Sequence, residues 1–145
     1  MIKEILLNEA VEFHMHAKDK DDLFHQMSQK LYDYHCIDNV EEFIKALYKR
    51  EAEGVTGMVN GLAIPHGLCD CVKKPTVLFC RLDNPIEYES MDGQKIDKIF
   101  MLAVPKNSSN EHLKILAMLS RKLMKQELVE KLNTIETKEE LNNLF

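Results

Sequence analysis

The chain has 145 residues, with 19 Lys and Arg against 24 Asp and Glu, four Cys and 45% hydrophobic residues. Domains cluster near about 100–150 residues, so this length predicts a single domain over residues 1–145. The net charge of −5 and the lack of a basic run argue against nucleic-acid binding, and no apolar run approaches the roughly 20 residues of a membrane span. No secretory signal opens the chain, so we expect a cytoplasmic protein that does not insert into a membrane.

One alternating run and two helical patterns occupy the first third of the chain. Residues 11–16 alternate between apolar and polar, which predicts a strand with His14 and His16 on its solvent face. Two amphipathic patterns follow, and Asp19 and Asn39 stand where helix N-caps are expected. The first third therefore predicts one strand and two helices.

Short apolar runs replace helical periodicity between residues 54 and 104. The runs 62–64, 76–80 and 99–104 are rich in branched or aromatic residues and are bounded by Pro or Gly, as buried strands are. Their near-continuous apolarity predicts helices on both faces of one sheet. Asp92-Gly93 predicts a turn before the last of these strands.

Helical patterns return after Pro105. Candidate caps at residues 107–110 precede a third long helix, whose first turn contains His112. Thr137 and the acid three residues later have the spacing of a capping box, which predicts a short helix at the end. Helices, then strands, then helices indicate a layered α/β or α+β domain.

The four cysteines are Cys36, Cys69, Cys71 and Cys80. A domain of this size does not need disulfides, and a cytoplasmic compartment keeps thiols reduced, so we expect reduced, partly buried side chains. Cys69-Asp-Cys71 beside His66 and Cys80 is an alternative zinc ligand set. Its spacing is Cys-x-Cys rather than the usual Cys-x2-Cys, so we expect no metal.

The most unusual local sequence is the stretch 56–67. A buried strand is predicted to stop at Pro65 and to carry His66, followed by Gly67, at its very end. Proline ends the ladder of hydrogen bonds, and glycine has no Cβ, so the imidazole is open to solvent and to a reacting partner. The pattern fits an exposed nucleophilic histidine, and it fits equally a turn that contains a polar residue.

The stretch 57–67, with Asn60-Gly61-x-Ala63-Ile64-Pro65-His66-Gly67 at its centre, resembles the active-site signature of a known family. This family is the fructose/mannitol class of enzyme IIA domains of the bacterial phosphoenolpyruvate-dependent sugar phosphotransferase system. Further similarities follow the family's order at Arg50-Glu51, Pro85-Ile86, Met91-Asp92-Gly93, 99–105 and 112–120. The resemblance covers nearly the whole chain and implies the family's fold, a mixed sheet with helices on both sides.

In that family the signature histidine takes a phosphoryl group from the phosphorylated carrier protein HPr and passes it to an enzyme IIB component. The resemblance therefore implies a phosphotransferase in which His66 is the phosphorylated nucleophile and His112 the second active-site histidine, which stabilises the phosphoryl group. A neutral imidazole is nucleophilic near pH 7, because the ordinary pKa of histidine is about 6.5. Fructose-like specificity, a IIB partner on a separate chain and an indirect link to a membrane IIC component are also implied.

Four further residues are candidates for the site. Arg50 offers a planar fork for phosphate oxygens, and a salt bridge with Glu51 is its competing role. Thr56, Asn60 and the backbone at Gly67 are candidate hydrogen-bond donors or turn residues. No nucleotide-binding loop and no carboxylate cluster for magnesium occurs, so we expect a relay without a cofactor.

Two other functions compete with the transport role. A regulatory paralogue, such as the nitrogen-related enzyme IIA, uses the same histidine to set a phosphorylation state that controls its partners. The motifs at the site do not separate that role from sugar transport. A scaffolding domain without phosphorylation is disfavoured, because both histidine positions occur with their glycine and proline context.

Overall fold

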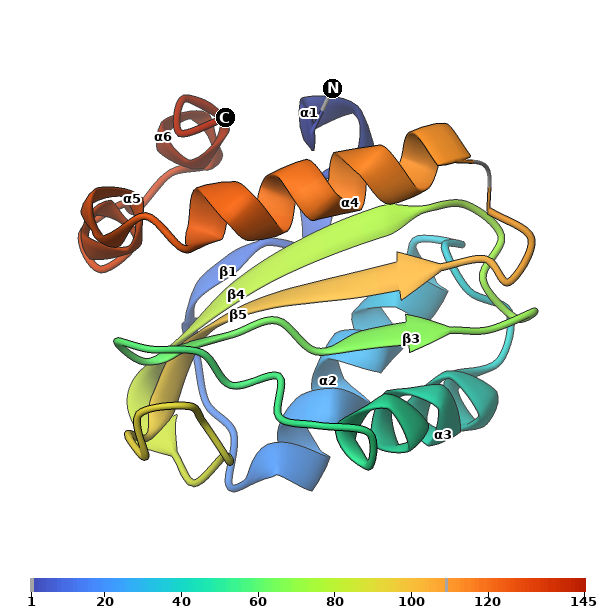
Figure 1. The fold of residues 1–145 in the computed structure, drawn as a ribbon, viewed down its shortest axis with the longest axis horizontal. Helices are drawn as coiled ribbons and strands as arrows, with labels where there is room; N and C mark the ends of the chain where they lie inside the picture. Colours follow the sequence, from blue (N-terminus) through green and yellow to red (C-terminus); the bar gives the residue numbers. More distant parts are fainter. Residues whose placement is uncertain (1, 109) are drawn as a thin grey trace.

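A mixed sheet lies between two layers of helices in the computed structural model, which describes residues 2–108 and 110–145 apart from the side chain of Glu111 (Figure 1). The helices are α1 (Ile2–Ile5), the 3-10 turn η1 (Asn8–Ala10), α2 (Lys20–Asp33), α3 (Val40–Glu51), α4 (Asn110–Leu123), α5 (Gln126–Lys131) and α6 (Lys138–Asn142). The strands are β1 (Glu12–Met15), β2 (Leu62–Ala63), β3 (His66–Leu68), β4 (Thr76–Ile86) and β5 (Ile96–Val104).

The strand order is β1-β4-β5-β2, and β3 also pairs with β5. The long hairpin partners β4 and β5 are antiparallel, whereas β1 runs parallel to β4, and β2 and β3 run parallel to β5. β2 and β3 therefore lie one after the other along the same edge of β5. This mixed sheet is the fold class that the sequence predicts.

Alternate residues of each central strand point into different layers. Leu78 and Cys80 of β4 join the hydrophobic cluster that contains the buried faces of α2 and α3, while Val77 and Phe79 join the cluster under α4, α5 and α6. Figure 1 shows α4 across one face of the sheet and α2 and α3 on the other, with both termini on the α4 side. Burial on both faces explains the continuous apolar runs of β4 and β5.

Three of the predicted caps are confirmed. The side chain of Asp19 accepts a hydrogen bond from the Asp22 amide at the start of α2, and the side chain of Asn39 does the same for Glu42 in α3. Thr137 caps α6, as the capping-box spacing predicts. Of the candidate caps before α4, Ser109 lies outside the described residues.

Two of the elements that differ from the prediction are α1 and β4. α1 was not expected, because its four residues are too few to show periodicity. β4 continues to Ile86, past a shift in register that follows Arg81. Arg81 is buried there and donates to the carbonyl oxygens of Leu132 and Ile135 and to the Glu136 carboxylate. The C-terminal segment thus supplies the hydrogen-bond acceptors for this buried residue of β4. No helix of the described residues is long and apolar enough to cross a membrane.

Candidate active site

His66 begins a strand instead of ending one. We predicted that the strand would stop at Pro65, but β2 ends at Ala63 and a short strand, β3, resumes at His66. The carbonyl oxygen of Pro65 accepts a hydrogen bond from the Leu102 amide at 2.9 Å, so the ladder with β5 continues although proline lacks an N–H. The His66 side chain is consequently half-buried, between the edge of the sheet and α3, and not fully exposed as predicted.

The two ring nitrogens of His66 have different partners. Nδ1 lies 2.9 Å from the carbonyl oxygen of Ile64, and because a carbonyl only accepts, Nδ1 carries the proton. Nε2 accepts a hydrogen bond from Nε of Arg50 at 3.0 Å, so Nε2 holds the lone pair. Burial lowers the pKa of His66 from its ordinary value, and the nearby charge of Arg50 lowers it further, while the hydrogen bond to Ile64 opposes these effects. The imidazole is thus kept neutral, with its nucleophilic nitrogen facing Arg50.

Arg50 lies in the last turn of α3 and is held at two points. In addition to Nε at His66, its Nη1 donates to the carbonyl oxygen of Gly54 at 3.0 Å. The competing expectation placed a salt bridge between Arg50 and Glu51. Glu51 instead pairs with Lys20, whose Nζ lies 3.1 Å from a carboxylate oxygen. The structure therefore brings Arg50 to the signature histidine.

A buried polar group supports the end of α3 behind Arg50. The Glu51 carboxylate accepts hydrogen bonds from the hydroxyls of Thr56 and Tyr88, and these two hydroxyls lie 2.6 Å apart. Burial raises the pKa of Tyr88, so its hydroxyl stays protonated and can donate. Thr56, a candidate hydrogen-bond donor, thus donates to this group. Lys20 and Tyr88 were missed as partners of Glu51, because they lie far from it in the sequence.

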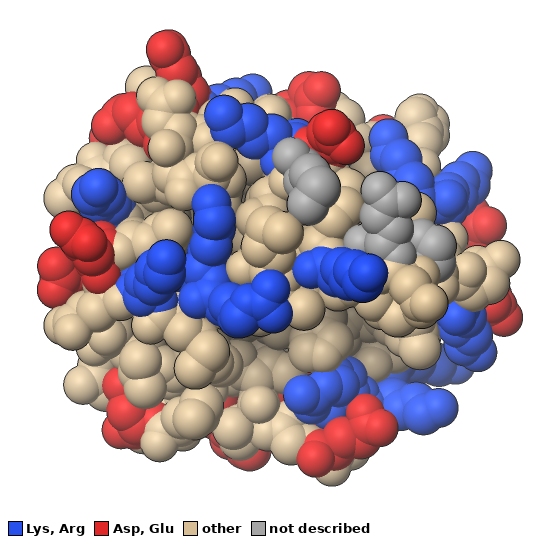
Figure 2. All heavy atoms as spheres, turned by 45° about the horizontal axis from the view of Figure 1, so that its top comes forward, with Lys and Arg blue, Asp and Glu red and all other residues tan. Residues whose placement is uncertain are grey.

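A hollow of about 450 Å³ opens beside His66, between α3, β3 and α4. Its walls are mainly apolar, and exposed Leu68 and Leu113 stand at its border. Lys49, Arg50 and Lys106 also line it together with one acid, Glu53, so positive charge predominates around an apolar recess. Figure 2, which views the α4 side, shows Lys and Arg gathered across the middle of this face, with Asp and Glu mostly nearer its margin.

Gly67 fits its place in β3 because it has no side chain. A Cβ there would lie 2.9 Å from Cε1 of Phe43 and 3.3 Å from Cβ of Ala46, both in α3. Glycine therefore allows α3 to pack directly against the strand that begins at His66. This close packing brings Arg50 within reach of the imidazole.

Two more predicted site residues, like Thr56, do not line the hollow at His66. Asn60 has a left-handed backbone with φ of 59°, and its amide donates to the Asp92 carboxylate at 3.0 Å, so it shapes a turn. His112 is in the first turn of α4, as predicted, and lines an adjoining hollow. The two hollows share Lys106, so His112 stands in a hollow that adjoins the candidate site.

The prediction of four reduced thiols was wrong for one pair. Cys69 and Cys71 are joined by a disulfide, whereas Cys36 and Cys80 are free and buried. Cys-x-Cys spacing allows this, because the two Cα atoms lie 5.2 Å apart, within the range for a disulfide. Among the described residues, the ligand atoms of Glu42, Cys69 and Cys71 lie within 4.8 Å of one another, a set without His66 or Cys80.

Comparison with known proteins identifies the family. The family described as "Phosphoenolpyruvate-dependent sugar phosphotransferase system, EIIA 2" matches residues 4–145. The chain belongs to this family. The resemblance noted from the sequence is thereby confirmed.

Three relatives show the breadth of the EIIA family. The fructose-specific EIIA component of Haloferax volcanii is 38% identical over 109 residues, which are 75% of this chain and 71% of the relative. The fructose-specific EIIABC component of Bacillus subtilis is 29% identical over 144 residues, 99% of this chain, but this chain spans only 23% of that longer protein. The crystal structure of nitrogen regulatory protein IIA-Ntr from Neisseria meningitidis has a TM-score of 0.88 at 32% identity, covering 99% of this chain and 97% of that one.

Proposed function

We propose that this EIIA protein is a phosphocarrier that receives a phosphoryl group on Nε2 of His66 from HPr and passes it to an enzyme IIB component. One observation carries the proposal: Nε2 holds a lone pair while Nδ1–H is fixed on the Ile64 carbonyl, beside a hollow open to a partner. The name of the B. subtilis relative, EIIABC component, is consistent with a IIB partner.

The transfer step is an exchange of one N–P bond for another. The lone pair of His66 Nε2 attacks phosphorus as the bond from phosphorus to the donor's nitrogen breaks, and the donor imidazole leaves with that electron pair. His66 Nδ1 keeps its proton, so the phosphorylated ring carries the charge of an imidazolium, which the Ile64 carbonyl stabilises at 2.9 Å. A positively charged ring is a good leaving group, which favours onward transfer.

Positive side chains stabilise the charge on the transferred group. Arg50 must release Nε2 when phosphorus approaches, and its guanidinium can then turn to the phosphoryl oxygens, where charge accumulates. Lys49 and Lys106 add positive charge at the border of the hollow. We assign His112 a secondary role in stabilising the phosphoryl group. It stands in the first turn of α4, and the N-terminus of a helix favours an anion.

The test is phosphorylation by phosphoenolpyruvate, enzyme I and HPr. Wild type should take up one acid-labile phosphoryl group, His66→Ala should take up none, and His35→Ala, which alters an exposed histidine, should be labelled like wild type. His112→Ala should be labelled more slowly but to the same extent. An unlabelled wild-type protein, or a labelled His66→Ala variant, contradicts the proposal.

A regulatory role is the second candidate. It is favoured by the likeness to the nitrogen regulatory protein of N. meningitidis, at 32% identity over nearly the whole chain. Transfer from the phosphorylated protein to a panel of IIB components separates the two roles. Passage to a fructose-type IIB supports the transport role with fructose-like specificity, and stable phosphoprotein with every IIB supports regulation.

A further inference from the structure

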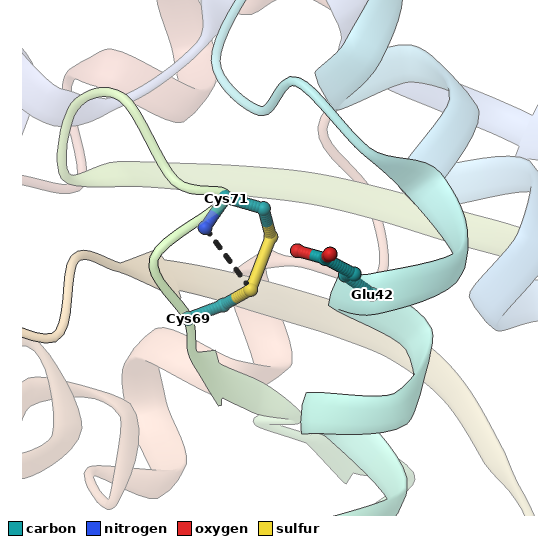
Figure 3. A group of neighbouring side chains, drawn as sticks. All are labelled: Glu42, Cys69 and Cys71. Carbon is teal, nitrogen blue, oxygen red and sulfur yellow. Dashed lines mark hydrogen bonds between the residues drawn. A yellow bond between two sulfur atoms is a disulfide. The ribbon is translucent and has the colours of Figure 1, made fainter.

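The Cys69–Cys71 disulfide lies directly beyond β3, the strand that starts at His66 (Figure 3). The Cys71 amide donates to Sγ of Cys69 at 3.2 Å, and both sulfurs face the carboxylate of Glu42 on α3. The bond joins residues two apart in the sequence, so it closes a very small loop within one segment. It connects no two elements of the fold.

Such a bond contributes little to holding the fold together. A disulfide stabilises mainly by restricting the unfolded chain, and this restriction is smallest for the shortest loops. The backbone on both sides is already fixed, because the Cys69 amide donates to the Val104 carbonyl at 3.0 Å and the Asp38 amide donates to the Cys71 carbonyl at 2.9 Å. The segment therefore keeps its place whether the sulfurs are bonded or reduced.

The pair differs from the other cysteines in its access to solvent. Cys69 borders a surface hollow of about 390 Å³ together with Glu42, Asp70 and three lysines. Cys69 is 7% exposed and Cys71 2%, whereas Cys36 and Cys80 are fully buried. Burial raises the pKa of Cys80 to about 12, which leaves that thiol unreactive. A reagent in the hollow thus meets Cys69 first and finds Cys71 next to it.

We propose that Cys69 and Cys71 form a redox-active pair that exchanges with disulfides of small thiols. The reduced Cys69 thiolate attacks one sulfur of the small disulfide, which forms a mixed disulfide and releases one small thiolate. The Cys71 thiolate then attacks Sγ of Cys69; the Cys69–Cys71 bond forms, the mixed bond breaks, and the second small thiolate leaves. Two electrons pass to the small disulfide, and the two thiol protons end on its two thiols. This proposal is independent of phosphorylation at His66.

The experiment equilibrates the whole protein with mixtures of reduced and oxidised glutathione, then traps free thiols with an alkylating reagent and counts them by intact mass. Wild type should change from four alkylated thiols under denaturing conditions to two as the oxidised fraction rises, and the change should reverse. Cys71→Ser should instead accumulate one glutathione adduct, on Cys69, because the resolving thiol is gone. Cys36→Ser is the matched control and should retain the two-thiol change.

Three outcomes overturn the proposal. In the first two, wild type keeps all four thiols at every glutathione ratio, or the disulfide resists reduction at every ratio, and either result excludes exchange. The third outcome is stoichiometric Zn²⁺ binding by the reduced wild type, lost in Cys69→Ser, with thiols that glutathione disulfide leaves unchanged. That result assigns Glu42, Cys69 and Cys71 to a metal site instead. The first two are read on the wild-type protein alone, so a poorly folding variant does not obscure them.

Discussion

Replacing Arg50 by Gln is expected to slow phosphorylation of His66 by about 2- to 30-fold. At rest, Arg50 Nε donates to the neutral Nε2 of His66 at 3.0 Å, a hydrogen bond of about 1 kcal/mol. Once Nε2 carries the phosphoryl group, the guanidinium can bond to charged oxygens instead, which contributes about 1.5–3 kcal/mol. The difference of about 0.5–2 kcal/mol corresponds to that range of rates.

The same substitution should change the titration of His66. Burial still lowers its pKa, but the charge of Arg50 no longer does, so the pKa should rise toward its ordinary value of 6.5. The two measurements are the initial rate of labelling from phosphorylated HPr and an NMR titration of the imidazole. Lys49→Gln is the matched control, because it removes a positive charge from the same hollow without a hydrogen bond to His66.

Two results would refute this account of Arg50. Labelling of Arg50→Gln at the wild-type rate would show that the guanidinium does not bind the transferred group. An equal slowing in Lys49→Gln would show that total positive charge at the hollow matters, and not the placement of Arg50. A small effect of the Lys49 change, within about twofold, is the expected result for an exposed charge.

Three further changes test the support of the site. The pKa of His66 is lowered on folding, so its contribution to stability is present above about pH 6.5 and is lost as the pH falls through the folded-state pKa. In urea unfolding, His66→Asn should therefore lose less of its free energy of unfolding over that pH window than wild type does. Gly57→Ala should destabilise by about 3 kcal/mol or more, seen as a lower melting temperature, because its Cβ would lie 2.2 Å from the Glu89 carbonyl oxygen. Glu51→Gln should cost about 2–3 kcal/mol in urea unfolding and slow labelling, because Lys20 loses its carboxylate partner and the end of α3 is held less firmly.

Each of these three predictions has a matched control variant. His35→Asn, at an exposed position, should keep the wild-type pH profile, and an unchanged profile in His66→Asn would argue against its lowered pKa. Gly67→Ala should lower the free energy of unfolding less than Gly57→Ala does, because the aromatic ring of Phe43 can shift more readily than backbone. A larger loss in Gly67→Ala would contradict this account of the packing. Glu53→Gln alters an exposed acid near Glu51 and should leave stability unchanged.

Local signals predicted most of the fold. Asp19 and Asn39 marked the helix starts correctly because N-caps act within three residues of the backbone groups that they satisfy. The apolar runs predicted β4 and β5 because burial on both faces leaves no polar position to interrupt them. The strand beginning at His66 was missed, because its three residues gain their order from pairing with β5, which no local pattern reveals.

The candidate site was predictable only in part. His66 and Arg50 were found through the signature, and the structure places them in direct contact. The partners of Glu51 were not found from the sequence, because Lys20 and Tyr88 lie 31 and 37 residues away from it along the chain. Asn60 occupies a left-handed turn, which agrees with the turn-residue alternative given for it.

The hydrogen bond between His66 Nδ1 and the Ile64 carbonyl also constrains the order of events at the site. It leaves the ring with one reactive atom, Nε2, and that atom cannot bond to a donor's phosphoryl group while it is delivering one to an acceptor. The two partners must therefore occupy the hollow in turn, with the phosphorylated protein as a free intermediate between them. Steady-state transfer should show ping-pong kinetics, and each unphosphorylated partner should inhibit the half-reaction of the other.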